Sequence, residues 1–202
     1  MGLSGFDTAV EDRRRFRACR RCYAGGAGDA RALPVASPIA RASLAITGER
    51  IAAVGSISPH EGREVVDAGQ LALSPGFIAA PTHDDRIVLD APEMLPKISQ
   101  GVTTVVTGNC GISLAPAVFE DDPPPPMNLL GGAEAYAFPD FAAYAAALRA
   151  AAPAVNVAAL IGHSALRLAT MTDVRRKADE HETSRMQAMA AEAMANGAAG
   201  FS

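Results

Sequence analysis

The sequence predicts an α/β protein with a small β-sandwich-like subdomain, followed by an incomplete (β/α)8 (TIM-type) barrel of about three βα units. Two observations carry this prediction. Two apolar runs, one beginning at Phe77 and one spanning 102–107, suit strands of a parallel sheet covered on both faces. A potential metal ligand follows each run, namely His83 and Cys110. Side chains just beyond the carboxyl ends of barrel strands carry the chemistry of such folds.

The composition of the chain excludes several classes of protein. The chain has 202 residues, 49% of them hydrophobic, and a formal net charge of −4, which is typical of a globular domain with a sizeable core. Mild acidity argues against nucleic acid as the main partner, and no apolar run approaches the ~18 residues of a membrane helix. Three cysteines do not make a disulfide framework, and no secretory signal is evident. We therefore expect a cytoplasmic protein.

Residues 1–40 differ from the rest of the chain. An arginine-rich block, 13–22, precedes a Gly/Ala-rich stretch without periodicity. Two functional interpretations stay open, a basic nucleic-acid arm or half of a structural zinc site at Cys19 and Cys22. Such a zinc site needs four ligands, and a second nearby pair is missing. Like-charge runs are more commonly solvated and disordered, so we predict a disordered basic leader.

Residues 41–73 are predicted to form the small β-sheet subdomain. Two short apolar strands, 43–47 and 50–55, flank a turn that contains glycine, which is the pattern of a β-hairpin. The stretches 64–69 and 70–73 repeat the pattern. A sheet of a few short strands needs a neighbouring structure for stability. We therefore expect this subdomain to accompany a barrel segment that begins at residue 74.

The barrel segment, 74–202, alternates strands with helices. Pro92 suits the first position of a helix that ends at Gly101, with Met94, Leu95 and Ile98 on its inner face. The run 102–107 follows as the second strand. The proline-rich excursion 121–126 is then either a lid over the strand ends or a surface loop.

The second half of this segment repeats the alternation. Apolar residues at helical spacing predict a helix over 138–148, and the strand 154–161 ends in Gly162-His163-Ser164. A further helix, 182–196, is expected to turn Met186, Met189, Ala193 and Met194 inward, and 198–202 begins another strand. A closed barrel takes about 250 residues and eight strands. We therefore expect the barrel to remain open.

The motifs resemble those of the metal-dependent amidohydrolase superfamily. The segments 50–55, 66–69 and 74–78 are similar to the opening of its members, which place a small β-sandwich before a (β/α)8 barrel. The segment 96–113, Pro-Lys-Ile-Ser-Gln-Gly-Val-Thr-Thr-Val-Val-Thr-Gly-Asn-Cys-Gly-Ile-Ser, resembles the D-aminoacylase branch, the N-acyl-D-amino-acid deacylases. Gly162-His163-Ser164 also fits that branch. The resemblance covers roughly residues 41–202.

This resemblance implies zinc-dependent hydrolysis of the amide C–N bond of a small N-acyl amino acid. It implies that Cys110 is a thiolate ligand of the zinc and that His83 is a ligand or near-ligand at the barrel mouth. His163 would either bind substrate or be a hydrogen-bonded structural residue. From the residues alone, Cys110 also stays open to interpretation as a buried small hydrophobe.

The sequence departs from the family pattern at the first strand and at its end. The family's first strand normally ends Asp-x-His-x-His, whereas 79–83 reads Ala-Ala-Pro-Thr-His, so that Pro81 replaces the first histidine. The resemblance places two further zinc-binding histidines and the general-base aspartate beyond residue 202. It therefore implies an incomplete zinc site and no general base in this chain.

Two hypotheses follow. The chain is the N-terminal part of an N-acyl-D-amino-acid deacylase, or it is a catalytically inactive truncated remnant or a split half that needs a C-terminal half-barrel partner. An open half-barrel exposes a strand edge and apolar helix faces. We therefore expect the chain alone to self-associate and to bind zinc weakly.

Overall fold

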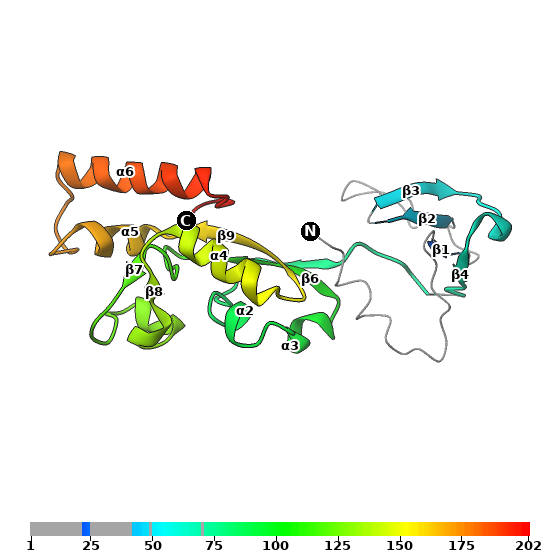
Figure 1. Ribbon diagram of the computed structural model, residues 1–202, viewed down its shortest axis with the longest axis horizontal. Helices are drawn as coiled ribbons and strands as arrows, with labels where there is room; N and C mark the ends of the chain where they lie inside the picture. The colour runs from blue at the N-terminus through cyan, green and yellow to red at the C-terminus, as the bar shows by residue number, and fades with distance from the viewer. Residues whose placement is uncertain (1–21, 25–41, 49, 70) are drawn as a thin grey trace. The chain divides into compact units, whose positions relative to one another are not determined.

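The computed structural model describes residues 22–24, 42–48, 50–69 and 71–202. The chain divides into two units, and the division falls between Pro75 and Gly76. Each unit contains its own four-stranded sheet (Figure 1). Most of the predicted leader, including Cys19, lies outside the described residues.

The sheet of the first unit has the order β3-β2-β1-β4. β2 (Ser43–Thr47) and β3 (Arg50–Gly55) pair antiparallel, which confirms the predicted hairpin. β1 (Cys22–Ala24) pairs antiparallel with β2 and parallel with β4 (Glu64–Val66). The short helix η1 (Pro59–Glu61) lies between β3 and β4.

The stretch 71–73, predicted as a strand of this sheet, is not one. The amide of Leu71 donates to the carbonyl of Ala68 at 2.9 Å, so the chain turns here instead of extending along β4. Leu71 is 69% exposed. Among the described strands, β1 lies between β2 and β4 and completes the four-stranded sheet.

The sheet of the second unit consists of four parallel strands in chain order, β5 (Phe77–Ala79), β6 (Val102–Thr107), β9 (Asn156–Ile161) and β10 (Gly200–Phe201). Figure 1 shows helices between successive strands. Parallel strands in chain order with intervening helices form a (β/α) barrel. In the described part of the chain, β5 and β10 each keep one unpaired edge. This confirms the predicted incomplete barrel.

β5 differs from the prediction of a strand buried on both faces. Phe77 and Ile78 are 61% and 67% exposed, because β5 is an outer strand that pairs only with β6 among the described strands. The inner strands behave as predicted, since Val105 of β6 and Ile161 of β9 are fully buried.

The predicted helix from Pro92 is reduced to the single turn α3 (Leu95–Ile98), and another short helix, α2 (Ile87–Asp90), precedes Pro92. Met94 lies between them with a left-handed φ of 47°, which interrupts a continuous helix. Met94 and Ile98 are buried as predicted and pack with Val105. Leu95 is 69% exposed. The prediction that it faces inward is wrong because a single helical turn buries only one side.

The remaining helices are α4 (Phe141–Ala151), α5 (His163–Thr170) and α6 (Glu180–Ala195). The side chain of Asp140 caps α4, and Asp179 and Glu182 form a capping box at the start of α6. α5 and α6 lie side by side (Figure 1). Met194 was predicted to face inward, but it is 39% exposed, whereas Ala193 is buried. In the described part of the chain, no helix is both long and apolar enough to cross a bilayer.

The segment between β6 and α4 contains the proline-rich excursion. Two short strands, β7 (Ala117–Val118) and β8 (Ala137–Phe138), pair antiparallel and enclose the helices η2 (Met127–Leu130) and η3 (Ala133–Ala135). Met127 and Tyr136 are fully buried and belong to the main core cluster. The segment 127–136 is therefore a packed part of the fold, whereas the proline-rich excursion 121–126 is exposed except at Pro123.

Candidate functional site

Three candidate residues lie beyond the carboxyl ends of neighbouring parallel strands. His83 follows β5, Cys110 follows β6 and His163 follows β9. All three side chains are exposed, and Cys110 is a free thiol. The interpretation of Cys110 as a buried hydrophobe is therefore wrong.

Cys110 lies in a tight turn, residues 108–111, which we call the Cys110 turn. Gly108, Cys110 and Gly111 have left-handed φ values of 76°, 58° and 76°. The fourth residue, Asn109, is buried. Its side-chain amide donates to the carbonyl of Val106 at 2.6 Å and to that of Thr82 at 2.9 Å. This contact joins the Cys110 turn to the residue that precedes His83.

Two side chains from outside the turn hold its glycines. The amide of Gly108 donates to Oδ1 of Asp85 at 2.7 Å, and the Ser202 hydroxyl donates to the carbonyl of Gly108 at 2.5 Å. The amide of Gly111 donates to the Ser202 hydroxyl oxygen at 3.2 Å. The glycines on both sides of Cys110 are therefore fixed by residues that follow other strands.

His163 is the first residue of α5 and lies close to the same turn. Its amide donates to the carbonyl of Ser202 at 2.9 Å, and the amide of Ser164 donates to the carbonyl of Gly111 at 2.8 Å. The imidazole ring lies edge-on to Phe201, with ring centroids 5.9 Å apart. The structure thus brings the backbone of His163 to the Cys110 turn and leaves its side chain exposed.

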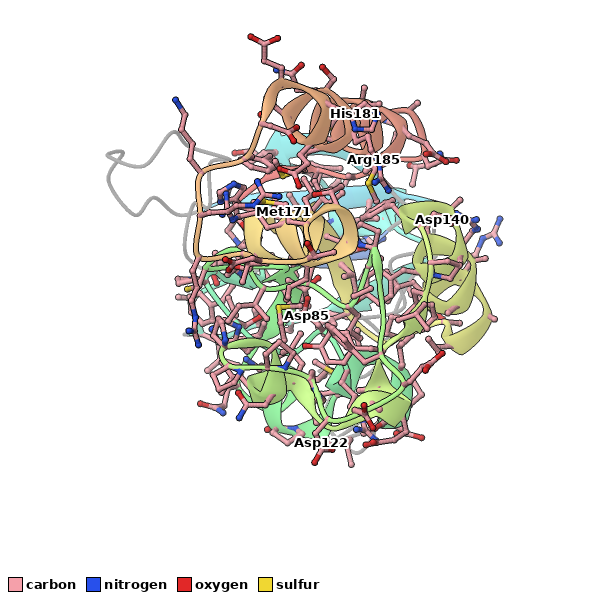
Figure 2. The ribbon with its side chains drawn as sticks, turned by 90° about the vertical axis from the view of Figure 1, so that its left-hand side faces the viewer. Asp85, Asp122, Asp140, Met171, His181 and Arg185 are labelled. Atoms are coloured by element: carbon pink, nitrogen blue, oxygen red, sulfur yellow. The ribbon has the colours of Figure 1, made fainter. Side chains whose placement is uncertain are left out.

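Asp85 is the most strongly perturbed acid near the strand ends. Burial raises its pKa to about 7, and the negative charge of Asp84 acts in the same direction, while backbone hydrogen bonds act against them. The hydroxyl of Tyr144 donates to the carbonyl of Asp85 at 3.0 Å, and burial raises the pKa of Tyr144 as well. Figure 2 shows Asp85 in the interior of the view, whereas Asp122 and His181 lie at its margin. Asp84 pairs instead with Lys97 at 2.8 Å.

The donor set near the strand ends fits part of a zinc site. Cys110 and His83 offer a sulfur and a nitrogen, which are ligand types that zinc prefers, but a catalytic zinc normally takes three protein ligands. Among the described residues, no group of three or more His, Cys, Asp or Glu could hold a metal ion. Pro81 has no donor atom for a metal. Cys110 and His83 alone therefore do not complete a catalytic zinc site.

Sequence reasoning missed three residues of this region, Asp85, Asn109 and Ser202. Each is polar and follows a parallel strand, which is a visible signal in the sequence. Their roles depend on bonds to residues distant in the chain, such as the bond from Ser202 to Gly108. Spacing along the sequence does not reveal such contacts.

Comparison with known proteins agrees with this arrangement. The sequence profile of the amidohydrolase family matches residues 64–202. A D-aminoacylase from Alcaligenes xylosoxydans xylosoxydans is 51% identical over 166 residues, which cover 82% of this chain and 34% of that protein. The chain thus spans about a third of the length of the curated relatives it matches.

Two solved structures are also similar. One is a D-aminoacylase described by its binuclear metal centre, with activation by one metal and attenuation by a second; it has a TM-score of 0.81 and 46% identity over 90% of this chain and 38% of its own. The other is the N-acyl-D-glutamate deacylase of Bordetella bronchiseptica with zinc and a phosphonate inhibitor, with a TM-score of 0.79 and 40% identity over 91% and 38%. The predicted resemblance is confirmed: this chain, with its parallel strands in chain order, belongs to the amidohydrolase family.

Proposed function

We propose that this chain forms the first part of the catalytic barrel of a zinc-dependent N-acyl-D-amino-acid deacylase, which hydrolyses the amide bond of a small N-acyl-D-amino acid. The Cys110 turn carries the proposal. It presents an exposed thiol at the end of a parallel barrel strand, in a chain that is 51% identical to a D-aminoacylase. A reducing cytoplasm suits a free thiol in this role.

Each candidate residue has one role in this proposal. Cys110 supplies a thiolate ligand, His83 supplies an imidazole ligand, and His163, whose exposed ring lies beside Phe201, contacts the substrate. When bound, zinc supplies polarisation of the acyl carbonyl and activation of the attacking water. The chain's own residues hold the thiol and the imidazole at adjacent strand ends.

The described residues do not supply the other parts of the proposed site. Two donors fall short of the three protein ligands of a catalytic zinc, so the proposal requires further histidines and a general-base aspartate on later barrel strands. The absence of a donor at Pro81 is compatible with activity, because a D-aminoacylase related to this chain is described as activated by one metal and attenuated by a second.

A second candidate function is a split half or an inactive remnant. The exposed apolar side chains on the two outer strands favour it, since Ile78 of β5 is 67% exposed and Phe201 of β10 is 55% exposed. Outer strands with unpaired backbone groups tend to pair with another chain. We infer that the chain alone either associates with itself or requires a C-terminal half-barrel to become active.

Hydrolysis of N-acyl-D-amino acids with added zinc tests both candidates. The chain is assayed alone and together with a separately produced C-terminal portion of the Alcaligenes D-aminoacylase, against the Cys110→Ala variant and the L-enantiomer as controls. Activity on the D-enantiomer that needs Cys110 supports the deacylase proposal, and its dependence on the added portion supports the split half. Turnover no higher than that of Cys110→Ala in either setting leaves the inactive remnant.

A further inference from the structure

One buried side chain connects the two loops that carry the candidate zinc ligands. Asp85 lies in the loop that contains His83, and its Oδ1 accepts the hydrogen bond from the amide of Gly108, 2.7 Å away in the Cys110 turn. Asp85 is only 1% exposed. The Tyr144 hydroxyl, which donates to the carbonyl of Asp85, fixes it from the core side.

The position of the Cys110 thiol depends on the backbone of its turn. Because the side chain is exposed, packing does not orient it. Its place is set by Gly108 and Gly111, whose left-handed conformations and outside hydrogen bonds define the turn. A change in the contact between Asp85 and Gly108 is therefore transmitted to Sγ of Cys110.

We propose that Asp85 is a positioning residue for the metal site, which holds the Cys110 turn at a fixed place relative to the His83 loop. Because it is buried, Asp85 acts through the amide of Gly108 and is not itself a ligand. This inference rests on the proposed function for the identity of the ion. The holding of the turn is a property of the chain itself.

The chemistry of Asp85 allows a matched pair of variants. Asp85→Ala removes the acceptor for the amide of Gly108 and leaves that donor without its partner. Asp85→Asn retains an Oδ1 acceptor in nearly the same volume. The second carboxylate oxygen, Oδ2, has no hydrogen-bond partner among the described residues, so its replacement by an amide nitrogen breaks no bond seen there.

Cadmium binding by Cys110 tests the functional part of the inference. Cys19→Ser and Cys22→Ser provide a parent chain with one thiol, and cadmium chloride is titrated while the near-ultraviolet sulfur-to-cadmium charge-transfer band is recorded. Mutation of a residue that orients a metal ligand through hydrogen bonds typically lowers the metal affinity by about 10–100-fold. We expect a loss of that size in Asp85→Ala and an affinity close to the parent's in Asp85→Asn.

A separate variant distinguishes positioning from general stability. Tyr136→Phe removes the buried hydrogen bond from the Tyr136 hydroxyl to the carbonyl of Met127, which lies outside the strand-end turns. Its cadmium affinity should equal the parent's although its stability falls. An unchanged affinity in Asp85→Ala, or an equal loss in Tyr136→Phe, overturns the inference.

Amide hydrogen exchange without metal tests the holding of the turn directly. The amide of Gly108 should exchange about tenfold faster or more in Asp85→Ala, because this amide loses its buried acceptor, and slowly again in Asp85→Asn. If cadmium gives no signal that depends on Cys110 in the parent, the metal role in the proposed function fails. The exchange result then decides alone, and equal exchange of Gly108 in Asp85→Ala and the parent overturns the inference.

Discussion

Alanine in place of Gly162 should destabilise the protein by steric conflict alone. Gly162 has φ −88° and ψ 136°, an extended conformation that alanine adopts freely. A Cβ atom there would overlap the main-chain carbonyl of Gly111 and lie 2.8 Å from the amide nitrogen of Ile112, closer than the optimum of about 3.5–4.0 Å between non-bonded carbon atoms. These neighbours are backbone atoms, so the end of β9 must move away from the Cys110 turn.

The expected loss in the free energy of unfolding follows from these contacts. Overpacking costs about 1–3 kcal/mol. The movement also weakens the bonds from Gly162 to the Ser113 hydroxyl, 3.0 Å, and from Ser164 to the Gly111 carbonyl, 2.8 Å, at about 1 kcal/mol each. Alanine restricts the unfolded chain and offsets about 0.4–1 kcal/mol. The net loss should be about 2–4 kcal/mol.

Urea unfolding followed by circular dichroism measures this loss, with Gly197→Ala as the matched control. Gly197 has a φ of 98° with no atom within 4 Å of an added Cβ, so alanine there introduces strain without steric conflict. That strain, about 1–2 kcal/mol, is only partly offset in the unfolded state, which leaves a loss of about 1 kcal/mol or less. Gly162→Ala should therefore lower the unfolding midpoint further than Gly197→Ala at an unchanged m value. Equal midpoints for the two variants would refute the steric argument.

Three further outcomes are expected. Asn109→Ala should lower the free energy of unfolding by about 1–3 kcal/mol in urea titrations, since the part-buried carbonyl of Thr82 loses this donor and that of Val106 keeps only its bonds from Thr82; a change below 0.5 kcal/mol, roughly the level of a surface substitution, would contradict the role of that amide. Hydrogen bonds from Arg176 lower the pKa of Glu182 to about 2, so this pair should stabilise the fold above the ordinary pKa near 4.5 and lose that effect as the pH falls toward 2. Melting temperatures measured from pH 6 to 2 should therefore fall more in the parent than in Glu182→Gln. Parallel curves for the two proteins would contradict a stabilising role of the pair. Sedimentation should show self-association of the chain that Ile78→Lys with Phe201→Lys reduces, and a monodisperse parent monomer with stoichiometric zinc by elemental analysis would contradict both the association and the weak zinc binding expected here.

The sequence predicts the inner barrel strands because a strand buried on both faces consists of a continuous run of apolar residues. The β-branched run 102–107 corresponds to β6, and the run 154–161 contains β9. The same logic fails at β5, because an apolar pair such as Phe77-Ile78 does not reveal whether later strands cover it. It also fails at Leu95, since Met94 adopts a left-handed conformation that no residue type in that segment indicates.

The candidate site is predictable only in part for a related reason. His83, Cys110 and His163 follow strands, and this order is visible in the sequence. The helix α5 is missed because it has only eight residues and no side-chain cap marks its start at Gly162, and the β7–β8 pair has only two residues in each strand. Asp85 meets Gly108 across 23 positions of the chain. Local patterns do not encode that pairing.

The backbone conformation of Cys110 lowers the stability of the fold at the residue that carries the exposed thiol. A left-handed φ of 58° favours glycine, and a side chain there costs about 1–2 kcal/mol. Cys110→Gly should therefore be more stable than Cys110→Ala by about 1 kcal/mol in urea unfolding, although both lack the thiol. Equal stabilities would show that the turn imposes no such strain. Folding stability alone favours glycine at this position, so the thiol of Cys110 carries a cost in stability.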